Sequence, residues 1–448
     1  MSSLIRNSLA RLLADGSGLV CGMIAGIITA RWLGPAGKGV FSTLTFLSGL
    51  LMQFCCVGLQ EASTVMVGQK KATIQEALSA TVPTISISAL IGIIGLWLIC
   101  AVQFKSDWSS VRFAVITACL SLPVAIFSNV LSGILISQNK VIHTSIILFI
   151  TSGLTTLGLW LFIAILPLTV LGGVLAGLLS STVGLIVIIA LLIKGGLSLS
   201  PRWNLRYITP ALRFGAVIQI SYLLIMMSAR VDLLLVYSMI GQAAAGYYSV
   251  ALTLGMLVGL APSALSIASF PRLAYLGNME AHLLTIRICR IGLAAAALSG
   301  IAMLIAIPVM VPFLFGQIYY QAIEPSLILV LGGVIWSVQW LLCRASAAQG
   351  NPGLVFYSFG VSLLVMLLFD YALIPLLGIV GAAIAAMIGP AIGLAVCLIL
   401  YCRKAGHALR LAEFLPCVND FRFLAASVMR AVSNEKSRPV VSSPELNA

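Results

Sequence analysis

The chain has 448 residues, of which 61% are hydrophobic and only 8% are charged. Soluble domains carry about 25% charged residues, so this composition excludes a water-exposed globular fold, and it equally excludes collagen-like, disordered, coiled-coil and disulfide-rich secreted chains. The net charge of +13 would indicate nucleic-acid binding in a soluble protein. In a membrane protein it reflects the Lys and Arg excess of cytoplasmic loops, so we expect the lipid bilayer, and no nucleic acid, as a partner.

Apolar runs of the length of a membrane span recur along the whole chain. The hydrocarbon core of a bilayer is about 30 Å thick, so one helical span needs about 20 apolar residues. Twelve runs qualify: 9–31, 40–60, 80–102, 112–136, 143–166, 170–193, 214–237, 246–269, 291–314, 326–348, 353–374 and 379–401. The runs are continuous and do not alternate, which predicts helices and not a β-barrel. The expected fold class is an all-α polytopic membrane protein.

Basic residues fall unevenly on the two sides of these spans. Four lie in one set of connections: Arg31, Lys38, Lys105 and Arg112. Fifteen lie in the other set: Arg6, Arg11, Lys70, Lys71, Lys140, Lys194, Arg202, Arg206, Arg213, Arg272, Arg287, Arg290, Arg403, Lys404 and Arg410. The positive-inside rule therefore places both termini in the cytoplasm. For the polar tail, residues 406–448, we expect a cytoplasmic segment, either frayed or with a short surface helix around Phe421–Val428.

The two halves of the sequence resemble each other. Gly34–Ser42, with Gly39 and Phe41, matches Gly241–Ser249, with Gly246 and Tyr248, at an offset of 207. Leu166–Leu168, followed by Gly173, matches Ile374–Leu376, followed by Gly381. Six spans per half is an even number, so we expect two parallel six-helix lobes, residues 1–200 and 201–405, related by a pseudo-two-fold axis along the membrane normal. Such lobes enclose a central cavity that opens to each side in turn.

Ionisable side chains inside spans cost about 2.5–3.5 kcal/mol each, so every one needs a partner or a function. The spans contain Asp15, Glu61, Arg230, Asp232, Arg344 and Asp370. Arg11 lies four residues before Asp15, a spacing that allows a structural ion pair near the membrane surface.

Arg230 and Asp232 are about 200° apart around their helix, so they must face different neighbours. Arg230 fits either an interhelical salt bridge or a cavity cation that binds phosphate or carboxylate. Arg344 has the same two interpretations and could also extend to the membrane surface. Asp370 is either a partner of one of these arginines or a protonatable coupling group.

Several enzyme signatures are absent from the sequence. There is no Walker lysine loop, no Gly-x-Ser-x-Gly elbow, no His-Glu-x-x-His and no carboxylate pair at catalytic spacing. The ten cysteines lie largely in apolar runs without metal-binding spacing, as buried thiols do. We therefore expect a protein that is not an enzyme and has no cofactor or metal site. A membrane enzyme such as a polysaccharide polymerase would also need large external loops, and the external connections here are short.

Five stretches together resemble the Wzx-type polysaccharide and O-antigen flippases of the multidrug/oligosaccharidyl-lipid/polysaccharide exporter superfamily. They are Ala30–Phe41, Arg230–Leu235, Gly246–Ala251, Phe270–Leu273 and Leu373–Ala385, and the resemblance extends from residue 4 to 404. It implies a two-lobed transporter of the bacterial inner membrane that moves a polyprenyl-pyrophosphate-linked oligosaccharide to the outer leaflet, with other polysaccharide-assembly membrane proteins as further partners.

The resemblance also guides the choice of candidate residues. Peptidoglycan-precursor flippases carry arginines in the first helix, where this chain has Leu19 and Ala25, leaving Arg31 as the shared one. Asp370 stands where the polysaccharide group often has Asn. The candidate substrate-binding cations are Arg230, Arg344, Arg31 and Arg11, and the candidate coupling or ion-pair carboxylates are Asp15, Asp232, Asp370 and Glu61. The alternative function is a cation-coupled multidrug or metabolite exporter, which would have a smaller and more apolar or acidic cavity.

Overall fold

The computed structural model describes residues 2–405 except 139, 199 and 276–277, and it places their side chains except those of 2–13, 15, 141, 268, 271–272, 274, 278–279 and 404–405. The elements, in order, are α1 (Ser2–Cys56), α2 (Leu59–Gly68), α3 (Ile74–Gln103), α4 (Trp108–Ser137), α5 (Val141–Leu159), η1 (Trp160–Ile165), α6 (Thr169–Lys194), α7 (Leu205–Met239), α8 (Gln242–Leu257), α9 (Leu260–Tyr275), α10 (Asn278–Met310), η2 (Val311–Phe315), η3 (Gln317–Ala322), α11 (Ile323–Ala348), α12 (Gly353–Leu377) and α13 (Ile379–Ala405). The predicted tail, 406–448, lies outside the described residues.

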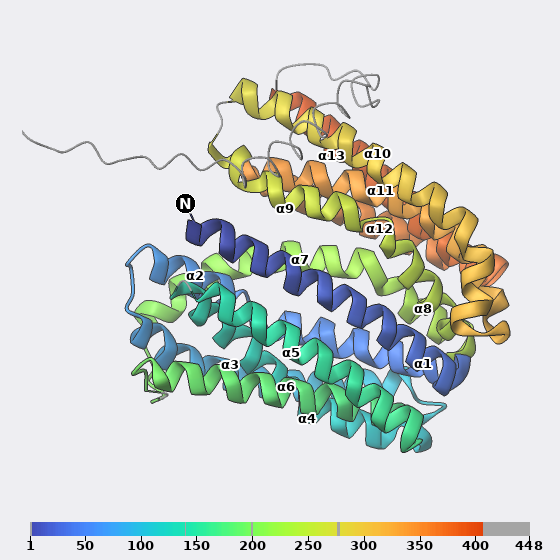
Figure 1. Cartoon of the computed structure of the whole chain (residues 1–448), viewed down its shortest axis with the longest axis horizontal. Coiled ribbons are helices and arrows are strands. Elements are labelled where there is room, and N and C mark those ends of the chain that lie inside the picture. Colours follow the sequence, from blue (N-terminus) through green and yellow to red (C-terminus); the bar gives the residue numbers. More distant parts are fainter. Residues whose placement is uncertain (1, 139, 199, 276–277, 406–448) are drawn as a thin grey trace, which may run out of the picture.

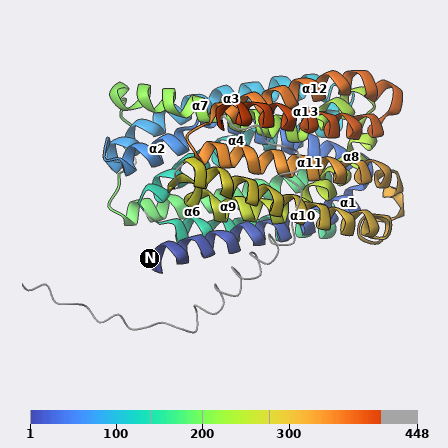
Figure 2. The ribbon, with the colours of Figure 1, turned by 90° about the horizontal axis from the view of Figure 1, so that it is seen from above.

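The helices run nearly parallel to one another along the long axis of the molecule (Figure 2). In the described part of the chain, ten helices are long and apolar enough to cross a membrane, and α8 and α9 pass the same test together, with a bend of 48° between them. One of these ten apolar segments, Gly16–Gly68, has 53 residues. As one straight helix it would extend about 80 Å, more than twice the hydrocarbon thickness. This segment therefore crosses twice, which completes the predicted twelve spans.

The reversal within α1 occurs at Gly34, which has φ 66° and ψ 178° and is followed by Pro35. Glycine adopts this left-handed φ without a steric penalty, and proline is well suited to the first position of the helix that follows. In Figure 1 the chain starts on the left, turns at the right and returns to α2 on the left. Below, the side on which α1 begins is called the amino-terminal side, and the side of the Gly34 turn is called the distal side.

We assign α1–α6 and α7–α13 to the two lobes that the sequence repeat predicts; α9–α13 lie on one side of α7 and α3–α6 lie on the other (Figure 1). The two copies of the repeat meet where α1 packs against α8 on the distal side. A Cβ atom on Gly39 would clash with the carbonyl oxygen of Gln242, and one on Gly246 would clash with that of Pro35. Adding 207 to Pro35 and Gly39 gives Gln242 and Gly246, so the contact is reciprocal, as a pseudo-two-fold axis between the lobes requires.

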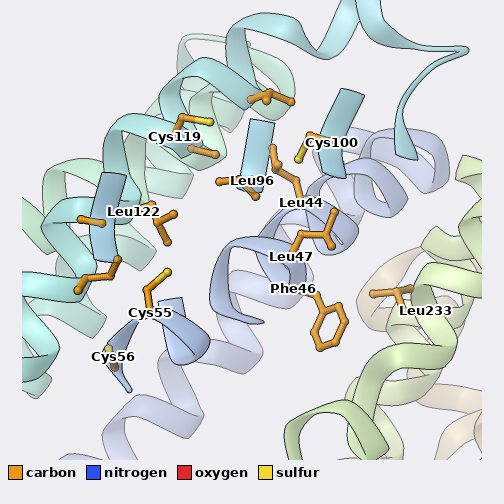
Figure 3. Close-up of a cluster of buried hydrophobic side chains, with 14 of the residues drawn as sticks. Leu44, Phe46, Leu47, Cys55, Cys56, Leu96, Cys100, Cys119, Leu122 and Leu233 are labelled. Carbon is orange, nitrogen blue, oxygen red and sulfur yellow. The ribbon is translucent and has the colours of Figure 1, made fainter. Parts of the chain in front are cut away.

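Four of the buried cysteines belong to the main apolar core. Cys55, Cys56, Cys100 and Cys119 lie among leucines of α1, α3 and α4 (Figure 3). All nine cysteines in the described residues are free thiols. In that same part of the chain, no three His, Cys, Asp or Glu side chains gather as metal ligands would. Small buried thiols fill these positions as apolar side chains do.

The position of Lys38 differs from the prediction. The sequence places it in a connection between spans, before a run that begins at residue 40, but the helix resumes at Pro35 and already includes Lys38. The side chain of Lys38 is only 7% exposed. The prediction was wrong because polarity was taken as the boundary of the span, whereas Gly34 and Pro35 set the start of the helix.

Candidate functional site

A cavity of about 450 Å³ lies between the lobes and is lined by both halves of α1, by α7, by α8 and by the start of α9. It extends from Gly18 and Gly22, before the Gly34 turn, to Lys38 and Phe41, just after it. The cavity therefore lies on the amino-terminal side of the contacts between Gly39 and Gln242 and between Gly246 and Pro35.

Two cations from opposite lobes face this cavity, Lys38 on α1 and Arg230 on α7. Lys38 donates from Nζ to Thr29 Oγ1 at 2.7 Å, and Arg230 donates from Nη2 to the Met256 sulfur at 3.2 Å. Neither bond neutralises a charge, and no carboxylate of the described residues forms an ion pair with Arg230. Arg230 is within electrostatic range of Asp232, although the two do not form an ion pair. Like charges that share a partly desolvated space repel each other, and an anion between them relieves that repulsion. We name this space the cationic cavity.

Hydroxyl groups supply the rest of the polar surface of the cationic cavity. They belong to Thr29, Ser42, Thr45, Ser249 and Thr253. Most of them already donate to a backbone carbonyl one turn earlier, as Thr253 Oγ1 does to Ser249 O at 2.9 Å. Their oxygen atoms remain available as acceptors, so they can solvate a polar headgroup that has left water. Together with the two cations, they suit an anion that also carries hydroxyl groups.

Direct contacts close the distal end of this cavity. Asp107, in the α3–α4 connection of one lobe, accepts hydrogen bonds from the Tyr237 hydroxyl at 2.8 Å and from Gln242 Nε2 at 3.1 Å, both in the other lobe. Tyr319 Oη also crosses between lobes to donate to Ala30 O at 3.0 Å. With the reciprocal glycine contact, these bonds exclude the distal side as a route into the cavity.

Arg31 belongs to this distal closure and not to the cavity lining. Its Nε donates to Leu314 O at 2.7 Å, and its Nη2 donates to Phe313 O. These carbonyls end the π-helix η2 and would otherwise lack a helical partner. The geometry explains Arg31 as a cap that joins the two lobes.

A second cavity, of about 270 Å³, lies within the lobe formed by α7–α13. Asp232 lines it together with Ser263, Trp336 and Trp340, and the remaining surface is mostly apolar or glycine. We name it the tryptophan cavity. Arg230 and Asp232 therefore face different cavities, as their spacing predicts. Met256 and Leu260 line both, so the two cavities are neighbours across the α8–α9 bend.

The two buried carboxylates of this lobe differ in their hydrogen bonds. Asp232 accepts from the Tyr248 hydroxyl and, at 2.8 Å, from the backbone N–H of Leu233. Asp370 on α12 is fully buried, and neither of its oxygens has a hydrogen-bond partner. Asp370 lies within electrostatic range of both Asp232 and Tyr248. The structure thus brings together two of the four predicted carboxylates.

Arg344 and Glu61 lie away from that pair. Arg344, near the carboxyl-terminal end of α11, packs its guanidinium over the rings of Phe270 and Trp340, with 5.1 Å and 5.4 Å to the ring centroids. Its Nε is buried without a hydrogen-bond partner. Glu61 is half-buried in the first turn of α2. The side chains of Arg11 and Asp15 lie outside those that the structure describes.

The chain matches the family described as polysaccharide biosynthesis protein over residues 4–276. This match covers more than half of the chain. The protein belongs to that polysaccharide biosynthesis family. A comparison with curated proteins finds no match.

Solved structures share the fold of this family member. The lipid II flippase MurJ in an inward closed conformation has a TM-score of 0.74 at 15% identity, over 97% of this chain and 93% of that one. An inward-facing multidrug resistance MATE family transporter of the MOP superfamily has a TM-score of 0.72 at 17% identity, over 89% and 98%. An outward-facing transporter of that family has a TM-score of 0.63 at 16% identity, over 90% and 95%. At these identities the likeness is one of fold.

Sequence reasoning did not identify Lys38, Asp107 or the tryptophan pair as parts of a site. A turn signal was present for Lys38, because Gly34-Pro35 marks a helix start one turn before it. Trp336 and Trp340 have the i, i+4 spacing that places side chains on one face of a helix. Asp107 carried no local signal, since its partners Tyr237 and Gln242 are more than 100 residues away in the sequence.

Proposed function

We propose that this protein moves a polyprenyl-pyrophosphate-linked oligosaccharide from the cytoplasmic to the outer leaflet of a bacterial inner membrane, with both termini in the cytoplasm and without enzymatic chemistry. The observation that carries the proposal is the pair Lys38 and Arg230, contributed by opposite lobes to one cavity. A pyrophosphate cannot cross hydrocarbon unaided because of the cost of removing water from its charges. Ammonium and guanidinium groups replace that hydration.

The placement of the two cations also provides a way to couple binding to movement. Without a ligand, their repulsion disfavours an approach of the lobes around the cavity. A pyrophosphate between them would bind to both and remove the repulsion, so the substrate would favour a state that the empty protein avoids. The polyprenyl chain would stay in the bilayer, where it gains nothing by moving into protein. Asp15, Asp232, Asp370 and Glu61 stay proposed coupling or ion-pair groups, and Arg344 and Arg11 stay candidate cations. Arg31, the fourth candidate cation from the sequence, caps η2 in the distal closure.

The test is to replace Arg230 by Gln and Lys38 by Met, separately, and to measure surface polysaccharide in cells that have lost the chromosomal gene. We expect each variant to export less than about a tenth of the wild-type amount, because a charge-assisted phosphate contact contributes about 1.5–3 kcal/mol. Arg213→Gln, an exposed site on the same helix, is the matched control and should export normally. Normal export by Arg230→Gln at equal membrane abundance would contradict the proposal.

One observation favours the alternative function, a cation-coupled exporter of drugs or metabolites. The tryptophan cavity is small, largely apolar and contains a carboxylate, as expected for a site that binds organic cations. Under this alternative, Asp232→Asn would abolish resistance to organic cations in a drug-sensitive host. Arg230→Gln would leave that resistance intact, and loss of the gene would not change surface polysaccharide.

A further inference from the structure

Two tryptophans stack on each other on one face of α11. Trp336 and Trp340 are one helical turn apart, and their rings stack with centroids 5.5 Å apart and planes 8° apart. Both are half-buried and both line the tryptophan cavity. The aromatic face continues toward the amino-terminal side, where Arg344 packs over Trp340. A ligand that entered from that side would meet these rings before it reached Asp232.

The lining of the tryptophan cavity excludes two parts of the proposed substrate. No Lys or Arg is among the described residues that line it, and Asp232 would repel a phosphate. The polyprenyl chain is already in hydrocarbon and has no hydrophobic driving force to leave it for an apolar pocket. The part that remains is the sugar, which is uncharged at most ring positions, has hydroxyl groups at its edges and presents apolar C–H groups on its faces.

The chemistry of the cavity suits such a ring. The face of an indole is electron-rich and attracts the weakly positive C–H groups of a sugar ring stacked on it. Asp232 accepts only two hydrogen bonds in the structure and has lone pairs left for sugar hydroxyls. A volume of about 270 Å³ is at the small end of ligand sites and fits one sugar residue better than several.

The relation between the two cavities matches the covalent structure of the substrate class. The first sugar of a lipid-linked oligosaccharide is bonded directly to the pyrophosphate. The cationic cavity and the tryptophan cavity are likewise adjacent and share Met256 and Leu260. We propose that Trp336 and Trp340 form the stacking surface that binds the first sugar of the headgroup while Lys38 and Arg230 hold its pyrophosphate. This inference rests on the proposed function and adds the location of sugar recognition to it.

Two probes separate sugar binding from phosphate binding. Purified full-length protein in lipid nanodiscs is titrated with polyprenyl pyrophosphate without sugar, and with the same lipid carrying one N-acetylglucosamine. We expect wild-type protein to bind the sugar-bearing lipid several-fold more tightly. Trp336→Leu and Trp340→Leu should each weaken binding of the sugar-bearing lipid by about three- to tenfold, with binding of the sugar-free lipid unchanged. Trp336→Phe, which keeps an aromatic face, should retain most of the preference.

Two variants serve as controls. Trp97→Leu removes a tryptophan that packs on Trp108 and lines neither cavity, and this variant should bind both lipids as wild type does. Arg230→Gln should weaken both probes equally. If wild-type protein binds the sugar-free lipid but gains nothing from the sugar, or if Trp336→Leu weakens both probes equally, the sugar site is wrong and the proposed function stands.

Two other outcomes overturn the inference in different ways. If wild-type protein binds neither lipid, the proposed function fails and the sugar site fails with it. If wild-type protein instead binds tetraphenylphosphonium, and both Trp336→Leu and Asp232→Asn lose that binding, the tryptophan cavity is a site for organic cations and not for a sugar.

Discussion

Asp370 is the residue whose burial is hardest to explain by packing. Its carboxylate is fully buried between helices, and neither oxygen has a hydrogen-bond partner. A buried polar group without a partner costs free energy, and ionisable residues that membrane helices keep at such a cost are generally functional. Asp232, by contrast, is held by Tyr248 and by the backbone of Leu233. We infer that Asp232 has a structural role and that Asp370 is the better candidate for ion or proton coupling.

This difference predicts opposite effects on stability. Asp232→Ala should lower the free energy of unfolding by about 2–4 kcal/mol, because it removes two hydrogen bonds to a buried carboxylate and leaves the Tyr248 hydroxyl unpaired. Asp370→Asn should leave stability unchanged or raise it by about 1 kcal/mol, because it replaces a buried carboxyl group that has no hydrogen-bond partner by an amide of similar size. Thermal unfolding in detergent, followed by intrinsic fluorescence, measures both variants.

Transport by the same variants completes the test. If Asp370 couples transport, Asp370→Asn should export less than about a tenth of the wild-type polysaccharide while remaining as stable as wild type. A variant that is stable and fully active would show that Asp370 has no coupling role. A loss of stability as large as that of Asp232→Ala would show instead that Asp370 has a structural partner.

At the scale of single elements, the close approach of α1 and α8 depends on two glycines. A side chain on Gly246 would clash with the carbonyl of Pro35, a backbone atom that cannot move without shifting the helix. Gly246→Ala should therefore push the distal ends of the lobes apart and reduce export to less than about a tenth. Overpacking of this kind also costs about 1–3 kcal/mol of stability. Surface polysaccharide and thermal unfolding are the measurements.

Gly177 in α6 provides the matched control, because a Cβ there would have no atom within 4 Å. Gly177→Ala should keep full export and should be as stable as wild type or slightly more so, since alanine is the better helix former. If Gly246→Ala exports as well as Gly177→Ala, tight contact between the repeat copies is not needed for transport.

The elements also show what the sequence could predict. Apolar runs and their length were enough for the twelve spans, because each span must satisfy its own backbone hydrogen bonds in lipid. The repeat predicted a pseudo-two-fold axis, and the reciprocal contacts of Gly39 and Gly246 agree with it. The site was predicted less well, because Lys38 was read as a loop charge and the partners of Asp107 are set by the packing of α3, α4, α7 and α8. Local patterns carry no information on such distant pairs.

At the scale of the whole molecule, the structure is closed on the distal side and has its cavities on the amino-terminal side of that closure. The Gly39 and Gly246 contacts fix the shape of the distal closure. The polar bonds of Asp107 to Tyr237 and Gln242 are the ones that can break and re-form as lobes separate. Hydrogen bonds to a charged group contribute about 1.5–3 kcal/mol each. Losing both would shift the balance between closed and open states by a factor of at least about 100.

Cysteine accessibility measures this balance from each side of the membrane. Thr253, which lines the cationic cavity, is changed to Cys in a background in which Cys21, Cys402 and Cys417 are Ser. A membrane-impermeant thiol reagent should label it rapidly from the amino-terminal side and slowly from the distal side. Adding Asp107→Ala should raise the distal labelling rate at least about tenfold, because the open state becomes more populated.

Ser109→Ala, a change at an exposed site in the first turn of α4, is the control and should leave both labelling rates unchanged. Equal labelling of the parent protein from both sides would contradict the closed distal side, and slow distal labelling in Asp107→Ala would show that the glycine contact alone keeps the lobes together.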